Sequence, residues 1–260
     1  NWLGCYTLGK SSMKKEQIAE LSKKTGISVK ELNRLNRDRW YHGTSFEDAC
    51  NIAKEGVIAS YNLGAELDFG MGFYLTDTYQ RAQDYVSRIP IINLDGTMTK
   101  RTGWAVVEFE FNPFHLLFIE ENTYRYRCFS KHDNEFAQFI FENRVHNVYN
   151  QKPHGYDLIW GVMSDSFPDQ VVLDYRNCVV SYERALELLK KPNSMRQLYI
   201  GNQKICDLLR MTDILKKEDN SYAESLYGRE RTCECFDSFF QREINGGTGK
   251  AEGEGDRPQL

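Results

Sequence analysis

Two short segments of this chain place a ring side chain beside glycines in strand-like runs, a combination that suits the binding of a flat, polar heterocycle. The first is Tyr-His-Gly-Thr at residues 41–44, and the second is Asp-Phe-Gly-Met-Gly-Phe-Tyr-Leu-Thr at residues 68–76. In the first, the imidazole of His42 can hydrogen-bond a ligand that lies against the bare backbone of Gly43. In the second, alternation along a strand projects Tyr74 from one face, where it is free to stack on a ligand ring.

This pair of motifs resembles the nicotinamide-binding half of the ADP-ribosyltransferase fold, in the histidine-tyrosine branch that includes diphtheria toxin and the poly(ADP-ribose) polymerases. Members of that branch carry a second aromatic residue eleven positions after the motif tyrosine, and Tyr85 occupies that position here. The chain is most similar to a group of small bacterial proteins of this superfamily, which share the run at 68–76 and a later segment at 155–162. The resemblance spans roughly Arg39 to Thr212.

The resemblance implies a role for each motif residue. His42 would hydrogen-bond the ribose of the adenosine half of NAD, the backbone of Gly43, followed by Thr44, would hold the nicotinamide amide, and Tyr74 with Tyr85 would sandwich the nicotinamide ring. Stacking of this kind contributes about 0.5–1.5 kcal/mol per aromatic pair, which orients a ligand without catalysing its reaction. NAD is then the co-substrate.

The third catalytic position departs from the family pattern. Catalysis in this branch usually depends on a glutamate from a later strand, and the strand predicted at 196–200 places Gln197 there. A neutral amide holds a ribose hydroxyl but supplies no negative charge and no general base. The expected catalytic set is therefore His42, Tyr74 and Gln197, with single transfer, slow turnover or glycohydrolysis rather than chain elongation. Other candidates for the third position are Gln203, Glu183 and Glu187, which lie in predicted helices.

Composition bounds the class of protein. With 260 residues and 41% hydrophobic residues, the chain can bury a sizeable core, and no apolar run approaches the ~18–20 residues that a membrane helix needs. The formal net charge of -4 gives no chain-wide case for nucleic-acid binding. The seven cysteines are odd in number and scattered, which indicates free thiols and a cytoplasmic location. Cys233 and Cys235 lack a second pair at zinc-site spacing, so we expect no metal.

The order of predicted elements indicates an α+β fold with a split, mostly antiparallel sheet. We expect a helical hairpin within residues 1–37, a main domain at 38–216, and an extension at 217–260 that ends in a disordered tail. Within the main domain, the patterns predict helices at 45–56, 79–86, 134–144, 182–190 and 202–211. They predict strands at 72–76, 102–111, 156–163 and 197–200, with an extended segment at 114–120.

These observations predict an NAD-dependent mono-ADP-ribosyltransferase that releases nicotinamide and transfers ADP-ribose to a macromolecular acceptor, protein or nucleic acid. The resembling group adds the expectation of a toxin or effector with a small antitoxin-like partner. One alternative is a non-catalytic NAD or ADP-ribose sensor, in which Gln197 marks lost chemistry. Another is a DNA-binding regulator, because the hairpin within residues 13–36 resembles the opening of a helix-turn-helix motif.

Overall fold

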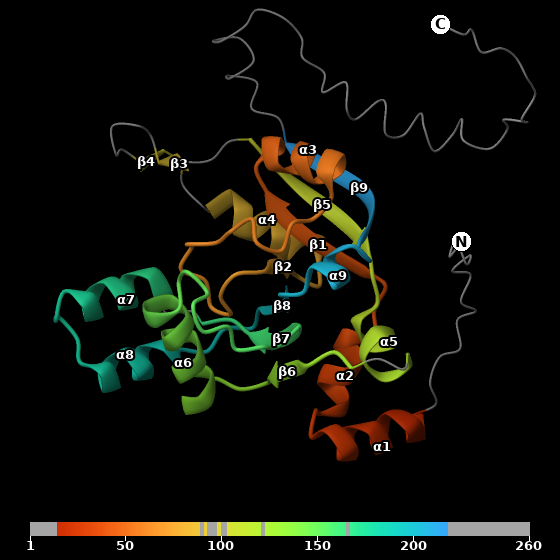
Figure 1. Ribbon diagram of the computed structural model, residues 1–260, viewed down its shortest axis with the longest axis horizontal. Helices are drawn as coiled ribbons and strands as arrows, with labels where there is room; N and C mark the ends of the chain where they lie inside the picture. The colour runs from red at the N-terminus through yellow and green to blue at the C-terminus, as the bar shows by residue number, and fades with distance from the viewer. Residues whose placement is uncertain are drawn as a thin grey trace, which may run out of the picture.

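Two sheets form the centre of the molecule, with helices packed around them (Figure 1). The computed structural model describes residues 15–88, 91–92, 98–99, 103–120, 123–164 and 167–217. The first sheet has the order β1-β5-β9, formed by β1 (Arg39–Thr44), β5 (Trp104–Glu110) and β9 (Arg210–Lys217). The second has the order β2-β8-β7-β6, formed by β2 (Phe73–Leu75), β8 (Arg196–Ile200), β7 (Leu158–Val162) and β6 (Tyr126–Phe129). A short pair, β3 (Ile91–Ile92) and β4 (Met98–Thr99), lies apart.

All strand pairs in the two larger sheets are antiparallel except β6 with β7. The helices that accompany them are α1 (Lys15–Thr25), α2 (Val29–Leu35), α3 (Phe46–Glu55), α4 (Tyr79–Arg88), α5 (Pro113–Phe118), α6 (Asn134–Phe141), the π-helix η1 (Glu142–His146), α7 (Pro168–Arg176), α8 (Tyr182–Leu189) and α9 (Gln203–Cys206). The prediction of a mixed fold of helices and mostly antiparallel strands is confirmed.

Strand β5 is buried on both faces and positions two helices against β1. Its residues Ala105, Val107 and Phe109 share a core cluster with Ala49 of α3. Its residues Trp104 and Val106 face the other way and pack with Ala82 and Val86 of α4. Because successive strand residues alternate between faces, α3 and α4 lie on opposite sides of the three-stranded sheet. Helix α4, which carries Tyr85, is therefore held beside β1.

The two faces of the four-stranded sheet pack into different clusters, and one of them carries Tyr74 and Gln197. Phe73, Leu75, Leu198 and Ile200 point into the same core cluster as β5 and the N-terminal helices. The partners Tyr74 and Tyr199 face the opposite side, where Tyr199 joins a second cluster with α6 and α8. Gln197 lies two residues before Tyr199 on β8 and shares that face. Two of the three predicted catalytic residues, Tyr74 and Gln197, thus lie on one face of one sheet.

Two of the predicted elements are wrong. Residues 113–118 form helix α5 rather than an extended segment, because the Asn112 side chain accepts a hydrogen bond from His115 N at 3.0 Å and Pro113 fits the first turn of a helix. The helix expected at 202–211 ends at Cys206, because residues from Arg210 onward pair with β5 and extend the first sheet. Helix α7 was not predicted. The expected disordered tail lies outside the described residues.

The N-terminal hairpin is part of the main core. Ile18 of α1 and Leu32 and Leu35 of α2 are buried in the cluster that contains Trp40 and Trp160. On α2, Glu31 is also buried; its carboxylate accepts a hydrogen bond from Trp160 Nε1 at 2.5 Å and pairs with Arg34 at 2.9 Å. Helix α2 therefore directs three of its seven residues inward. These contacts favour a packed extension over the DNA-binding alternative.

The buried carboxylate of Glu31 gives a test of this docking. We expect Glu31→Ala to lower the free energy of unfolding by about 3–5 kcal/mol, because it leaves the Trp160 N–H and the Arg34 guanidinium without their buried partner. Urea denaturation measures the change. Glu20→Ala, at an exposed position on α1, is the control and should change stability by less than about 0.5 kcal/mol. Equal, small losses in the two variants would contradict the structural role of Glu31.

Candidate functional site

The two sheets meet at a single backbone bridge and then separate. Tyr41 of β1 and Thr76 exchange both backbone hydrogen bonds, at 3.0 and 2.8 Å, and the pairing stops there. In an antiparallel ladder, residues two apart point their backbone groups to the same side, so the next rung would join Gly43 to Tyr74. The carbonyl oxygen of Tyr74 instead lies 2.7 Å from Nδ1 of the His42 ring. A side chain therefore replaces a backbone rung where the sheets divide.

His42 is fixed in one tautomer by this contact. A carbonyl oxygen only accepts, so Nδ1 carries the proton and donates it to Tyr74 O. The ring also lies against Phe73, with 4.4 Å between ring centroids. Burial lowers the pKa of His42 below its ordinary value of 6.5, despite the opposing effect of the Tyr74 hydrogen bond. The imidazole is therefore neutral near pH 7, and Nε2 is a hydrogen-bond acceptor.

Gly43 lies on the open edge of β1 and against α4. A Cβ atom at this position would approach the carbonyl oxygen of Ala82 to 2.3 Å and the side chain of Val86 to 3.1 Å. Only glycine allows α4 to pack this closely. Since β1 is an edge strand and its bridge ends at Tyr41, the N–H and C=O groups of Gly43 have no strand partner on this edge within the described residues. One donor and one acceptor are left side by side.

Tyr74 is held rigidly rather than free. Its hydroxyl donates to Gly70 O at 2.7 Å and accepts from Phe69 N at 3.0 Å, and its ring packs edge-on against Tyr199 at 5.4 Å. Burial raises the pKa of Tyr74 well above its usual value, and the charge of Asp68 raises it further. The phenol is thus neutral and oriented, and Tyr74, which is half-buried, is also among the residues that line the pocket described below.

Tyr85 lies on α4 with 48% of its surface exposed. Partial burial of its phenol raises the pKa of Tyr85, and the charge of Asp68 raises it further while Arg144 opposes the shift. The same carboxylate acts on the pKa of Tyr74, so both phenols lie within electrostatic reach of Asp68. The two tyrosines that were predicted to sandwich a ring therefore share one charged neighbour.

Gln197 is buried on β8, and its Nε2 donates to Asp68 Oδ2 at 3.0 Å. The other candidates for the third position do not approach this group. The side-chain amide of Gln203 is used by the backbone of Val57 and Ala59, at 2.8 and 2.9 Å. Glu187 pairs with Lys190 at the surface, and Glu183 is an exposed residue of α8. Gln197 is the one of the four that the fold brings beside Tyr74.

Two residues of this group, Asp68 and Arg144, were missed as site residues. Arg144 Nε lies 2.7 Å from Asp68 Oδ1, and Asn143 Nδ2 lies 3.2 Å from the backbone oxygen of Asp68. Both partners come from the π-helix η1, whose wider turn directs consecutive residues inward, and π-helical turns are frequent at functional sites. The available signal was Asp68 itself, an acidic residue that opens the second motif.

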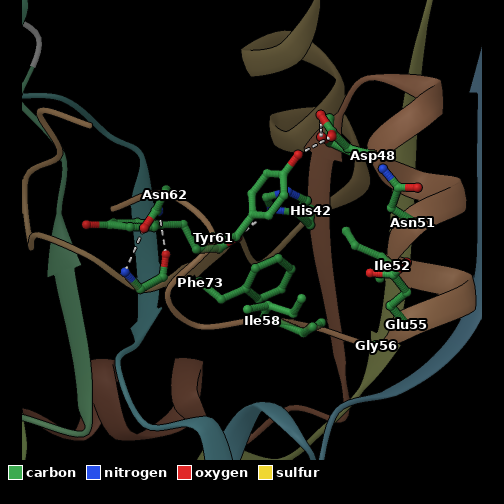
Figure 2. A pocket seen from close by; sticks show the side chains of 14 residues that line it. His42, Asp48, Asn51, Ile52, Glu55, Gly56, Ile58, Tyr61, Asn62 and Phe73 are labelled. Atoms are coloured by element: carbon green, nitrogen blue, oxygen red, sulfur yellow. Dashed lines mark hydrogen bonds between the residues drawn. The ribbon is translucent and has the colours of Figure 1, made fainter. Parts of the chain in front are cut away.

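A pocket of about 270 Å³ opens on the His42 side of the divided sheets (Figure 2). Tyr61 faces it, and the Tyr61 hydroxyl donates to Asp48 Oδ1 at 2.9 Å. Thr44 also contacts Asp48, with Oγ1 3.3 Å from Oδ2. The lining combines these polar groups with apolar side chains, and no lysine or arginine of the described residues belongs to it. It consists of His42, Thr44, Asp48, Asn51, Ile52, Glu55, Gly56, Val57, Ile58, Tyr61, Asn62, Gly72, Phe73 and Tyr74.

The wall of this pocket that carries Gly72 is tightly constrained. The amide of Asn62 holds Gly72 from both sides, donating to its carbonyl at 2.6 Å and accepting from its N–H at 3.0 Å. A Cβ atom on Gly72 would come within 2.1 Å of the Tyr199 ring. The hydroxyl of Tyr199 in turn donates to Met71 O at 2.7 Å. The loop before β2 is thereby fixed against β8.

Other features of the described part of the chain add no further site. No group of three or more His, Cys, Asp or Glu side chains gathers at metal-binding distance there, and none of its helices is long and apolar enough to span a membrane. Cys50, Cys128, Cys178 and Cys206 form no disulfide. Burial raises the pKa values of Cys128 and Cys206 to about 12, so both are protonated near neutral pH. Cys5, Cys233 and Cys235 lie outside the described residues.

A sequence model of the family described as Protein of unknown function (DUF3990) matches residues 40–211. The match covers about two thirds of the chain, so the protein belongs to this family. It begins in β1 and ends in β9, which includes every residue of the candidate site and leaves out the N-terminal hairpin. No curated protein and no solved structure matches the chain. The function therefore has to be argued from the site.

Two partly buried histidines, His42 and His154, give a prediction for pH dependence. His154 donates from Nε2 to Phe69 O at 3.0 Å, since its Nδ1 accepts from Tyr156 N at 3.0 Å. Burial lowers the pKa values of both His42 and His154 below 6.5. The unfolded chain then binds protons that the folded chain does not, so stability is present above pH 6.5 and is lost as the pH falls below it.

We expect the free energy of unfolding to fall between pH 7.5 and pH 5.5, by at most about 1.4 kcal/mol per pH unit for each imidazole. Urea denaturation at several pH values measures the slope. His154→Gln should reduce the slope, whereas His146→Gln, at an exposed position, should leave it unchanged. A slope that is the same in both variants and the wild type would contradict this account.

Proposed function

We propose that this protein is an NAD-dependent mono-ADP-ribosyltransferase of the ADP-ribosyltransferase fold, which releases nicotinamide and transfers ADP-ribose to a macromolecular acceptor. The observation that carries the proposal is the open edge at Gly43. The carboxamide of nicotinamide has an N–H donor and a C=O acceptor. Gly43 offers the complementary backbone groups, a C=O acceptor and an N–H donor, at a strand edge. The aromatic rings of Tyr74 and Tyr85 belong to the adjoining strand and helix, as a stacked nicotinamide requires.

The pocket beside His42 supports binding of the adenosine half of NAD. The neutral His42 ring has its Nε2 lone pair available for a ribose hydroxyl, because Nδ1 is committed to Tyr74 O. Asn51 and Asp48 supply polar groups, and Ile52, Ile58 and Phe73 supply an apolar wall. Asp48 and Glu55 make the lining acidic, and the described part of the chain contributes no lysine or arginine to it, which favours a ribose and base over a phosphate group in this pocket.

The proposed reaction breaks the bond between C1′ of the ribose and the nicotinamide nitrogen. The electron pair of that bond leaves with nicotinamide, which is neutral once released, and the ribose develops cationic character. A lone pair of the acceptor forms the new bond to C1′, and the acceptor proton passes to solvent. The site contributes by holding the nicotinamide and the ribose in one orientation, which lowers the entropic part of the barrier. The neutral Gln197 amide supplies no general base, so we expect transfer of a single ADP-ribose to each acceptor. Water is the competing acceptor.

The second candidate is a sensor that binds NAD or ADP-ribose without turnover. The observation in its favour is that Gln197 is a neutral, buried amide already bonded to Asp68. A sensor and a transferase share the same binding residues, so binding alone does not separate them. Release of nicotinamide does.

The experiment is to measure nicotinamide release from NAD by the purified protein, alone and with cell lysate. Release that requires lysate supports transfer to a macromolecule, and a labelled ADP-ribose adduct identifies its class. Release without lysate supports hydrolysis or self-modification by the same site. Tight NAD binding without release under either condition favours the sensor, and neither binding nor release refutes the proposal.

Tyr85 provides a variant that separates binding from folding. Because its phenol makes no hydrogen bond among the described residues and is about half exposed, Tyr85→Ala should leave the melting temperature nearly unchanged. Loss of one stacked ring should weaken NAD binding by about 2- to 13-fold, from ~0.5–1.5 kcal/mol of stacking. Calorimetric titration with NAD measures the change.

The matched control is Tyr149→Ala, which removes another exposed tyrosine, 69% accessible, outside the pocket. It should bind NAD with wild-type affinity. If both variants bind NAD equally well, Tyr85 does not cover a nicotinamide ring and the proposed geometry of the site is wrong.

A further inference from the structure

Asp68 is a carboxylate buried beneath the proposed NAD site, with 6% of its surface exposed. Its two oxygens have different partners: Oδ1 accepts from Arg144 Nε at 2.7 Å, and Oδ2 accepts from Gln197 Nε2 at 3.0 Å. Asp68 thus binds the Arg144 guanidinium with one oxygen and the Gln197 amide with the other.

The hydrogen bond to Asp68 determines which way the Gln197 amide points. An ionised carboxylate only accepts, so it selects the NH₂ end of the amide and turns the carbonyl Oε1 away from itself. Among the described residues, no hydrogen-bond donor contacts Gln197 Oε1. This atom is also not one of the fully buried polar atoms that lack a partner, so part of its surface is accessible. Oε1 is therefore an oriented acceptor on the face that carries Tyr74.

The group around Asp68 has an excess of negative charge. Arg144 is shared, because its Nη1 also lies 2.7 Å from Asp169 Oδ1 and 2.6 Å from the backbone oxygen of Glu66. Two carboxylates and one guanidinium leave one net formal negative charge, although Asp169 has 82% of its side chain exposed, so solvent screens its part of that charge. The charge of Asp68 reaches the ring side chains: burial raises the pKa values of both Tyr74 and Tyr85, Asp68 raises them further, and Arg144 opposes the shift.

We propose that Asp68 supplies the acidic function that Gln197 lacks, acting through Gln197 as a positioning residue of the NAD site. The inference rests on the proposed function. Asp68 directs the Gln197 carbonyl toward a ribose hydroxyl of NAD and places a negative charge near the ribose as it becomes cationic. The pair thereby does with two side chains, an amide in front and a carboxylate behind, what a single glutamate does alone.

Exchanging the carboxylate of Asp68 and the amide of Gln197 tests these two roles. In the double variant Asp68→Asn/Gln197→Glu, the new carboxylate faces the ligand and the new amide lies behind it. Every hydrogen bond is preserved, because the asparagine oxygen accepts from Arg144 while its NH₂ donates to the glutamate. The amide-carboxylate pair and the net charge of the group are unchanged, and only their order is reversed.

The two single variants break the pair in opposite ways. Asp68→Asn removes the charge and allows the Gln197 amide to flip, which presents a donor in place of the acceptor. Gln197→Glu places two carboxylates in contact, and like charges at this distance disfavour double ionisation. We expect each single change to lower kcat for nicotinamide release by roughly 10²-fold with a smaller change in KM, a loss typical of one preorganised electrostatic group. The double variant should recover to within about tenfold of wild type.

The control is a second amide-carboxylate pair outside the site. Gln170 Nε2 donates to Asp174 Oδ1 at 2.7 Å on the exposed side of α7. The variant Gln170→Glu/Asp174→Asn should release nicotinamide at the wild-type rate. Urea denaturation of all variants, which needs no NAD, reports the Asp68–Gln197 coupling separately from turnover.

The outcomes distinguish this inference from the proposed function. A wild-type protein that neither binds NAD nor releases nicotinamide refutes the proposed function, and the role of Asp68 falls with it. A wild-type protein that turns over, with single variants that keep its kcat, refutes the role of Asp68 alone. A double variant that is as slow as the slower single variant, although its stability is restored, also refutes that role. The net charge of the pair would then not be what sustains turnover, because the double variant keeps that charge.

Discussion

The hydrogen bond from the His42 ring to the backbone oxygen of Tyr74 is the interaction on which the arrangement of the site depends. It occupies the oxygen that a continuous ladder would give to Gly43, directly after the Tyr41–Thr76 bridge. The two sheets therefore diverge at this point instead of fusing into one. The same bond sets the tautomer of His42, so the residue that opens the sheet also presents an acceptor to the space that results.

Around that opening, rigidity comes from groups that are each held at more than one point. Tyr74 is fixed by its hydroxyl at Gly70 and Phe69, and Gly72 is held by both ends of the Asn62 amide. Arg144 binds Asp68, Asp169 and the Glu66 backbone together. A site built from such constraints loses little freedom when a ligand binds, which is the physical meaning of preorganisation.

Local patterns in the sequence predicted most of the elements, and they failed where distant parts of the chain decide the outcome. Helix α3 was predictable because Ser45 caps it and Gly56 ends it, both within the segment. Strand β9 was not, because its residues also suit a helix and only pairing with β5, some hundred positions earlier, selects a strand. Gln197 was proposed as a site residue from the family resemblance together with its place in a predicted strand. The contact with Asp68 was not, because it joins positions far apart in the sequence.

The opening in β1 is also short. On one side of Gly43, Tyr41 is already bonded to Thr76, and on the other side the chain leaves the strand at Ser45, which caps α3. An exposed sheet edge usually invites another strand, in aggregation or in peptide recognition, because it repeats its donors and acceptors over several residues. Between Tyr41 and Ser45, Gly43 offers one unpaired donor and acceptor among the described residues, and the pattern then ends. Such an edge has room for the single small amide proposed above and is too short to template a strand, so this unpaired position, as the described residues show it, does not invite pairing with another chain.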